Sequence, residues 1–171
     1  IDNSGSICES DNAQGTFRYS AIGGGDLPTL DGYNILEITN GSWNATLTAP
    51  GDILSAVSLS VIAGTLDLNL NDVELSVTTT TDNHDTIEGS DTEPMTFTGD
   101  YTGFAGSTLI TSGTNTYFRG ANTDLSGTLT ATAGIVMFDG TGDQTLIPPT
   151  AGSFITLTVN KAGGFFTVDP G

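Results

Sequence analysis

The stretch that decides the fold runs from residue 61 to residue 77 and reads VIAGTLDLNLNDVELSV. Apolar and polar residues alternate on both sides of Asn71 and Asp72. Because the side chains of a strand point to opposite faces at every second residue, this alternation predicts two short strands, each with one buried face. Asn71-Asp72 predicts a turn between them, since short amide and carboxylate side chains tolerate turn backbone. A hairpin and two sides of a continuing coil both satisfy this local pattern.

A recurring pair of residues favours the coil. Threonine followed by Leu, Ile or Val recurs at steps of 17, 19, 21, 22, 20, 17 and 22 residues. A recurrence near 20 residues is typical of one turn of a β-solenoid, in which each coil stacks on its predecessor. We therefore predict an all-β chain folded as a right-handed parallel β-helix of about eight coils of roughly 20 residues, with a β-sandwich as the alternative. The pairs begin at Thr29, Thr46, Thr65, Thr86, Thr108, Thr128, Thr145 and Thr167.

The domain organisation follows the same pattern. Residues 1–26 are rich in Gly, Ser, Asn and Asp and are expected to form an entry or capping segment. Residues 27–171 are predicted to form the solenoid, with an acidic loop inserted at residues 78–93, where the apolar alternation stops. Residues 23–38 and 140–159 resemble each other across roughly 120 residues, which predicts further repeats of the same kind in the parent chain.

Charge excludes several partners. Arg18, Arg119 and Lys161 stand against 20 acidic residues, which gives a net charge of −17. Such a chain repels phosphate backbones and anionic lipid surfaces, so neither a nucleic acid nor a membrane surface is expected as a partner. No apolar run of 18 residues is present, so no membrane insertion is expected.

Three strings of residues resemble a known class of repeats: FDGTGDQTL at residues 138–146, LTVNKAGG at 157–164 and AGTLDLN at 63–69. They are similar to repeats in giant cell-surface proteins of Bacteroidetes that are exported by the type IX secretion system, including gliding-motility adhesins. The resemblance covers about residues 23–170. It implies an extracellular location at the cell surface and a structural or adhesive role, as a stalk or as a surface that contacts glycans.

No catalytic constellation is recognisable, and we expect no enzyme. The single histidine, His84, lies in a polar run, and no Gly-x-Ser-x-Gly element occurs. Lyases of anionic sugars need cationic groups for the developing negative charge, and three basic residues are a poor supply. A polysaccharide-degrading or carbohydrate-binding β-helix is nevertheless the first alternative function. An ice-binding β-solenoid, with threonines aligned on one face, is the second.

The acidic run supplies the candidate sites. Asp82, Asp85, Glu88 and Asp91 are candidate calcium ligands, because calcium takes six to eight oxygen ligands and a flexible acidic loop can supply them. A solvated charged loop is the alternative reading. A second candidate group lies along the coils at Asp67, Asn69 and Asp72. The tripeptide around Thr86 resembles the short O-glycosylation signal of exported Bacteroidetes proteins.

Overall fold

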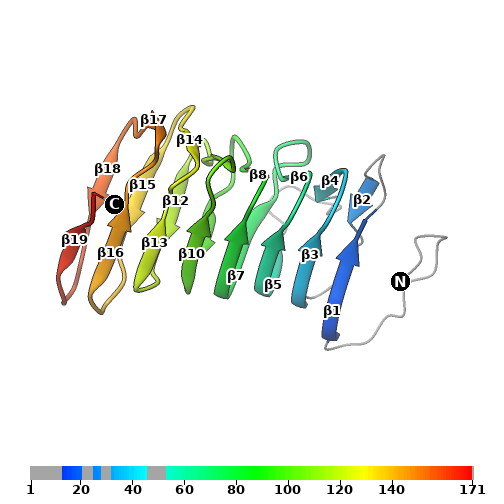
Figure 1. Ribbon diagram of the computed structural model, residues 1–171, viewed down its shortest axis with the longest axis horizontal. Coiled ribbons are helices and arrows are strands. Elements are labelled where there is room, and N and C mark those ends of the chain that lie inside the picture. The colour runs from blue at the N-terminus through cyan, green and yellow to red at the C-terminus, as the bar shows by residue number, and fades with distance from the viewer. Residues whose placement is uncertain (1–12, 21–24, 28–31, 46–52, 171) are drawn as a thin grey trace.

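The structure, a computed structural model, describes residues 13–20, 25–27, 32–45 and 53–170. Throughout this part of the chain the fold is all-β, without helix, and parallel strands stack into a β-solenoid of about six turns (Figure 1). The count differs slightly from the predicted eight. Successive residues in register on one face are Thr86, Thr108, Thr128 and Ala151, which lie 22, 20 and 23 residues apart.

Each turn contributes strands to three faces, and all strand pairs are parallel. The strands are β1 (Ala13–Tyr19), β2 (Gly25–Leu27), β3 (Tyr33–Ile38), β4 (Ser42–Ala45), β5 (Ile53–Val61), β6 (Thr65–Asp67), β7 (Glu74–Asn83), β8 (Thr86–Glu88), β9 (Met95–Phe97), β10 (Asp100–Gly103), β11 (Thr108–Ile110), β12 (Asn115–Phe118), β13 (Asn122–Asp124), β14 (Thr128–Thr130), β15 (Ile135–Phe138), β16 (Gln144–Ile147), β17 (Ala151–Ser153), β18 (Leu157–Val159) and β19 (Phe166–Val168).

Two of the faces belong to one sheet that divides at β7. The first part of β7 pairs with β9, and its second part pairs with β10. Beyond this point β9, β12, β15 and β18 form the first face, while β10, β13, β16 and β19 form the second. The third face is a separate sheet in the order β17-β14-β11-β8-β6-β4-β2. The solenoid is therefore a three-sided rod whose ends are marked by β1 and β2 on one side and β17, β18 and β19 on the other (Figure 1).

The stretch at residues 61–77 forms two sides of a coil. β6 pairs with β4 and β8, whereas β7 pairs with β5, β9 and β10, so the two strands do not pair with each other. The predicted turn is present: Asp72 has a φ of 53°, and Asp67 Oδ1 accepts hydrogen bonds from the backbone N–H of Asn69 at 2.8 Å and of Leu70 at 3.3 Å. Leu70 is 65% exposed because it lies in this turn.

The core is a column of side chains that points inward from successive coils. Phe97, Phe118 and Phe138 stack with ring centroids 5.2 Å and 5.4 Å apart and interplanar angles of 15° and 22°. Tyr101 meets the first two of these rings edge-on, at 5.0 Å and 5.4 Å. All four side chains are buried. Aromatic rings carry much apolar area, so this stack makes a large contribution to the stability of the core.

The prediction of a loop at residues 78–93 is wrong for most of that segment. Residues 78–83 continue β7, and residues 86–88 form β8, so this segment makes two ordinary sides of a coil. The apolar alternation stops because two inward positions carry the polar residues Thr81 and Asn83, both buried. β-Branched threonine favours strands, which is consistent with this placement.

The solenoid also begins earlier than residue 27. β1 pairs in parallel with β3, and β2 pairs in parallel with β4, so both strands already belong to coils. Arg18 on β1 donates to the Glu37 carboxylate on β3 at 2.6 Å, a link between neighbouring coils. The part of the predicted capping segment that lies at residues 1–12 and 21–24 falls outside the described residues.

Candidate contact surface along the solenoid

The four predicted calcium ligands lie on different elements. Asp82 belongs to β7 on the second face, and Glu88 belongs to β8 on the third. Asp85 lies at the corner between these strands, and Asp91 follows β8. Among the residues that the structure describes, no group of three or more His, Cys, Asp or Glu side chains is arranged to hold a metal ion. The coil thus separates residues that are close in sequence.

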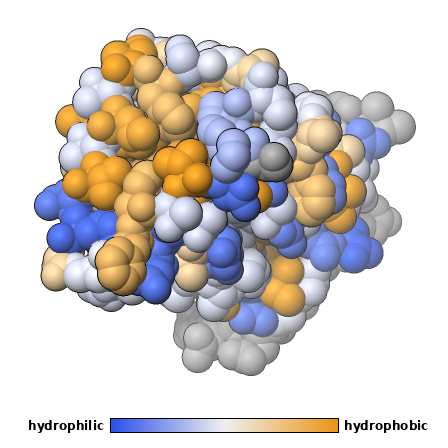
Figure 2. Space-filling model, turned by 60° about the vertical axis from the view of Figure 1, so that its left-hand side comes forward, coloured by the Kyte–Doolittle hydropathy of each residue, from blue (hydrophilic) through white to orange (hydrophobic). Residues whose placement is uncertain are grey.

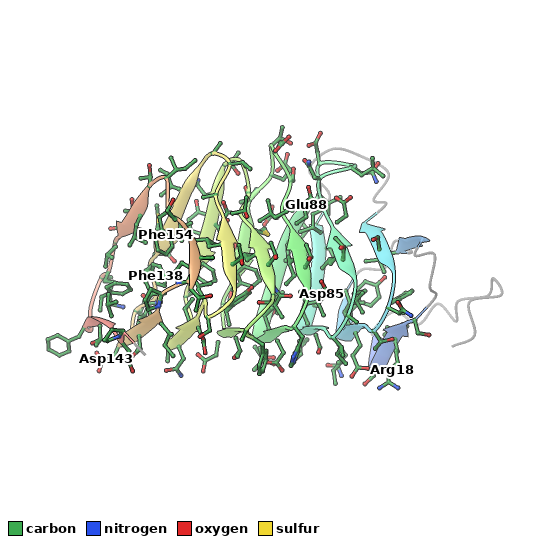
Figure 3. The ribbon with its side chains drawn as sticks, turned by 45° about the horizontal axis from the view of Figure 1, so that its top comes forward. Arg18, Asp85, Glu88, Phe138, Asp143 and Phe154 are labelled. Atoms are coloured by element: carbon green, nitrogen blue, oxygen red, sulfur yellow. The ribbon has the colours of Figure 1, made fainter. Side chains whose placement is uncertain are left out.

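Asp85 holds a corner of the coil. Its Oδ2 accepts a hydrogen bond from the Gly64 N–H at 2.7 Å, and its Oδ1 accepts one from the Thr86 hydroxyl at 3.2 Å. Gly64 has a φ of +98°, and a Cβ there would collide with the Gly41 carbonyl of the preceding coil. Only glycine fits this position, and the Asp85 carboxylate satisfies its backbone N–H. Figure 3 labels Asp85 and Glu88 on neighbouring parts of the same coil.

Of the predicted ligands, Glu88 interacts with Asp91, and it also interacts with Asp67 of the second candidate group. It lies in register with Asp67 of the preceding coil. Partial burial raises the pKa of the Glu88 carboxyl, and the negative charges of Asp67 and Asp91 raise it further. These three carboxylates repel one another, because like charges disfavour the ionised form.

Two residues of the second candidate group make hydrogen bonds between coils. Asn69 Oδ1 accepts from the Asp91 N–H at 3.0 Å, and Asp72 Oδ1 accepts from the Ser90 hydroxyl at 3.3 Å. Both contacts join one coil to the next at the corner between the third and the first face. These hydrogen bonds, together with the turn at this corner, account for the Asp and Asn side chains in this part of the chain.

A column of threonines is present on the third face. Thr65, Thr86, Thr108 and Thr128 are in register on β6, β8, β11 and β14, as the recurring pair predicted. Thr86, the predicted glycosylation residue, is therefore a strand residue and is half-buried. The pairs at 29 and 46 fall outside the described residues.

The last two predicted pairs belong to another face. Thr145 on β16 and Thr167 on β19 are in register with each other on the second face and do not extend the column on the third. The 22-residue step from Thr145 to Thr167 is one turn, whereas the 17-residue step from Thr128 to Thr145 changes face and is shorter than a turn. The period therefore identifies coils but does not assign a residue to a face.

The column beside the threonines on the third face contains acidic, apolar and hydroxyl side chains. Asp67, Glu88, Ile110 and Thr130 form the neighbouring column in register, two residues along each strand. Two carboxylates thus stand beside the threonines in β6 and β8. Carboxylates hold their own hydration water, so this part of the face is not a uniform array of hydroxyl and methyl groups.

An exposed ring pair lies at the corner between the second and third faces. His84 follows β7 and Phe104 follows β10, and their rings stack with centroids 3.8 Å apart and an interplanar angle of 10°. His84 is exposed, and Phe104 is 40% exposed. Ile62 occupies the equivalent position of the preceding coil, following β5, and is 48% exposed. We call Ile62, His84 and Phe104 the corner column.

A buried polar network supports the corner column from beneath. Asn83 is buried; its Nδ2 donates to the Tyr101 hydroxyl at 3.1 Å and to the Thr108 carbonyl at 3.0 Å. Burial raises the pKa of Tyr101 strongly, so its hydroxyl stays protonated. The Phe104 N–H donates to the Asn83 carbonyl at 2.9 Å. A buried polar group with its partners in place makes the local geometry specific, so the two rings are held by a fixed backbone.

The sequence did not single out this ring pair. Its only sequence signal is that His84 and Phe104 are 20 residues apart, about one turn. Tyr33 and Tyr101 are not available to a sugar ligand, because they are 2% and 1% exposed.

Comparisons with known proteins add no information on identity: no protein-family model, no curated protein and no solved structure matches this chain. Within the described residues, no helix is long and apolar enough to cross a membrane.

Proposed function

We propose that this chain is a structural and adhesive segment of a large extracellular surface protein, a stalk that contacts surfaces or glycans without catalysing a reaction. The observation that carries the proposal is the continuity of the rod. In the part of the chain that the structure describes, the strand ladders run through successive coils on three faces without an antiparallel pair (Figure 1). The aromatic stack follows them inside.

Continuity favours a mechanical role because each coil is bonded to its neighbours by many parallel backbone hydrogen bonds. In such repeat architectures stability arises from neighbour contacts, and extended side faces remain free for binding. The acidic side faces keep the rod soluble and separate from other anionic polymers. This charge also fits an extracellular location at the cell surface, as the resemblance to exported adhesin repeats implies.

The corner column is the proposed contact surface, and neutral glycans are its proposed ligands. Sugar rings present C–H groups that pack on apolar and aromatic side chains, and Phe104, His84 and Ile62 offer such groups. Asp82 and Thr102 precede His84 and Phe104 by two residues, lie on the second face and are in register with each other. Their oxygens can accept hydrogen bonds from sugar hydroxyls.

Binding to an array of neutral and acidic polysaccharides tests this proposal. For any polysaccharide that the wild-type chain binds, Phe104→Ala should lower the affinity about tenfold, which corresponds to the loss of one aromatic packing contact. Leu70→Ala is the matched control, because Leu70 is also an exposed apolar residue but lies away from the corner column. Circular dichroism should be unchanged in both variants. Equal binding by the wild-type chain and Phe104→Ala, or binding to no surface or glycan at all, would contradict the proposal.

Of the alternatives, an ice-binding face has one observation in its favour, the threonine column on β6, β8, β11 and β14. Asp67 and Glu88 beside that column weaken it. A calcium site does not enter the proposal, because the four predicted ligands lie on separate elements. Glycosylation of Thr86 stays a prediction.

A further inference from the structure

Asn40 and Gly41 form the corner between β3 and β4 and lie outside both strands. The sequence contains no other Asn-Gly pair. The Asn40 side chain is exposed, and its Oδ1 accepts a hydrogen bond from the Gly41 N–H at 2.8 Å. Exposure by itself does not select a residue, because hydrophilic side chains are spread over the surface of the rod (Figure 2). The distinguishing feature is the contact between this carboxamide and the backbone nitrogen that follows it.

The corner requires glycine at position 41. Gly41 has a φ of 75°, a left-handed backbone in which a residue with a side chain would be strained. Because glycine has no Cβ, its backbone nitrogen is also open to an approaching group. The same corner geometry that requires glycine therefore leaves this nitrogen accessible to the Asn40 carboxamide.

The next coil explains why Gly41 bonds to its own neighbour. Gly41, Gly64 and Asp85 occupy the same position in three successive coils, because each precedes a residue of one column in register on β4, β6 and β8. The Asp85 carboxylate accepts a hydrogen bond from the Gly64 N–H at 2.7 Å. Gly64 cannot do the same for Gly41, because a Cβ at Gly64 would lie 1.9 Å from the Gly41 carbonyl oxygen. The Asn40 carboxamide satisfies the Gly41 N–H instead.

We propose that Asn40, a residue of a thermolabile type, is a site of spontaneous deamidation with water as the co-reactant. Hydroxide removes the proton of the Gly41 nitrogen, which then attacks Asn40 Cγ and closes a five-membered succinimide ring. The Cγ–Nδ2 bond breaks, and Nδ2 leaves as ammonia with a proton from water. Water then opens the ring by breaking either bond between the nitrogen and a carbonyl carbon. The product is an aspartyl residue, or an isoaspartyl residue in which the main chain runs through the side-chain carbonyl.

Both products change the corner between β3 and β4. Each adds a carboxylate to a chain that already has a net charge of −17. The isoaspartyl product also lengthens the main chain by a methylene group. The Gly41 carbonyl accepts a hydrogen bond from the Thr65 N–H at 2.9 Å and packs closely against Gly64, so a longer main chain disturbs the contact between β4 and β6. This reaction does not depend on the proposed adhesive function.

The pair Asp139 and Gly140 contains the same ring-forming atoms, but each of them has another partner. Arg119 Nε donates to the two carboxylate oxygens of Asp139 at 3.0 Å and 3.2 Å. The Gly140 N–H donates to Oε1 of the buried Gln144 at 3.1 Å. We therefore expect this pair to stay intact in the folded chain and to isomerise only when urea unfolds it.

Peptide mass spectrometry of the folded chain, incubated at mildly alkaline pH, tests the proposal. The peptide that contains Asn40 should lose ammonia and gain a carboxyl group. The rate should rise in proportion to the hydroxide concentration, because the attacking nitrogen must first lose its proton. Asn40→Asp is the reference for the aspartyl product, and an isoaspartyl-specific methyltransferase labels the other product. The Thr65 amide should exchange hydrogen faster in the isoaspartyl form than in Asn40→Asp.

Two glutamine variants separate ring closure from general hydrolysis. Asn40→Gln should slow ammonia release from this peptide at least about tenfold, because the longer side chain no longer closes a five-membered ring. Asn122→Gln is the matched control and should leave that release unchanged: Asn122 is also exposed, but it precedes a β-branched residue and its Nδ2 donates to Asp100 at 2.9 Å. An Asn40 that stays intact in the folded chain, equal conversion of Asn40 and Asp139 there, or equal ammonia release by the wild type and Asn40→Gln would each overturn the proposal.

Discussion

The middle of the rod and its C-terminal coil are built from the same columns but differ in burial. Phe118 on β12 is 1% exposed, whereas Val159, two coils later in the same column, is 46% exposed. Both are inward-pointing apolar residues in parallel strands. The difference is that Phe118 has a coil on each side and Val159 has one on a single side. In a solenoid, burial is thus a property of the neighbouring coils, which is why stability in such folds is a sum over neighbour contacts.

The largest loss of stability is expected for a substitution inside the aromatic stack of the middle coils. Phe118→Ala should lower the free energy of unfolding by about 3–5 kcal/mol, since it leaves a cavity between Phe97 and Phe138. Val159→Ala should cost less than about 1 kcal/mol, because half of the removed surface is already in water. Urea unfolding of both variants, followed by circular dichroism, measures the difference. Similar losses for the two variants would show that the last coil is as well packed as the middle.

A polar clasp joins these two regions. Lys161 Nζ in the last coil donates to the carbonyls of Gly140 at 2.9 Å and Gly142 at 2.6 Å, and to Gln144 Oε1 at 2.9 Å. Gln144 is buried, and its Nε2 donates to the carbonyls of Phe118 and Gly120, each at 3.0 Å. The lysine therefore completes a chain of hydrogen bonds that spans three coils.

Removal of the clasp should have an intermediate effect. Lys161→Met should lower the unfolding free energy by about 1–3 kcal/mol, because it removes the charged donor of these three hydrogen bonds. Arg119→Met is the matched control: it breaks the exposed ion pair with Asp139, whose closest N–O distance is 3.0 Å, and should cost less than about 1 kcal/mol. Hydrogen exchange should show that Lys161→Met speeds exchange at β18 and β19 first. An equal response to the two substitutions would mean that the clasp contributes nothing specific.

The smallest effect on stability is expected from the negative net charge, which the middle coils carry and residues 144–171 do not. The pKa of Glu88 is raised in the folded chain by burial and by Asp67 and Asp91, so folding favours its protonated form. The stability that this proton contributes is present below the carboxyl's ordinary pKa and is lost as pH rises through the raised pKa.

Glu88→Gln should therefore be more stable than the wild type at neutral pH, by less than about 1 kcal/mol because solvent screens the site. The advantage should vanish below about pH 4, where the wild-type carboxyl is protonated. Thermal melts at several pH values measure it. Glu37→Gln is the control with the opposite sign at neutral pH, since it removes the partner of Arg18. A Glu88→Gln variant with lower stability at neutral pH would mean that its carboxylate is a favourable partner.

Sequence reasoning predicted the all-β solenoid from two signals, alternation and period. Alternation at residues 61–77 predicted the strands, and the period predicted that they belong to coils, as β6 and β7 do. The loop prediction at residues 78–93 failed because Thr81 and Asn83 are polar yet point inward. Asn83 is tolerated there because Tyr101 and Thr108 satisfy its amide. These hydrogen-bond partners belong to the next coil, so the residues beside Asn83 in the sequence do not predict them.

The sequence by itself determined that this chain winds in stacked parallel turns, because side-chain alternation and a period near 20 residues are local and regular. It also determined that the charge is concentrated before residue 144. Only the tertiary structure decided which residues share a face: it separated Asp82 from Glu88, joined His84 to Phe104, and left Val159 in water. The physical reason is that the corners vary in length, so the residue number alone does not fix the face on which a residue lies. Burial also depends on whether a neighbouring coil covers the residue.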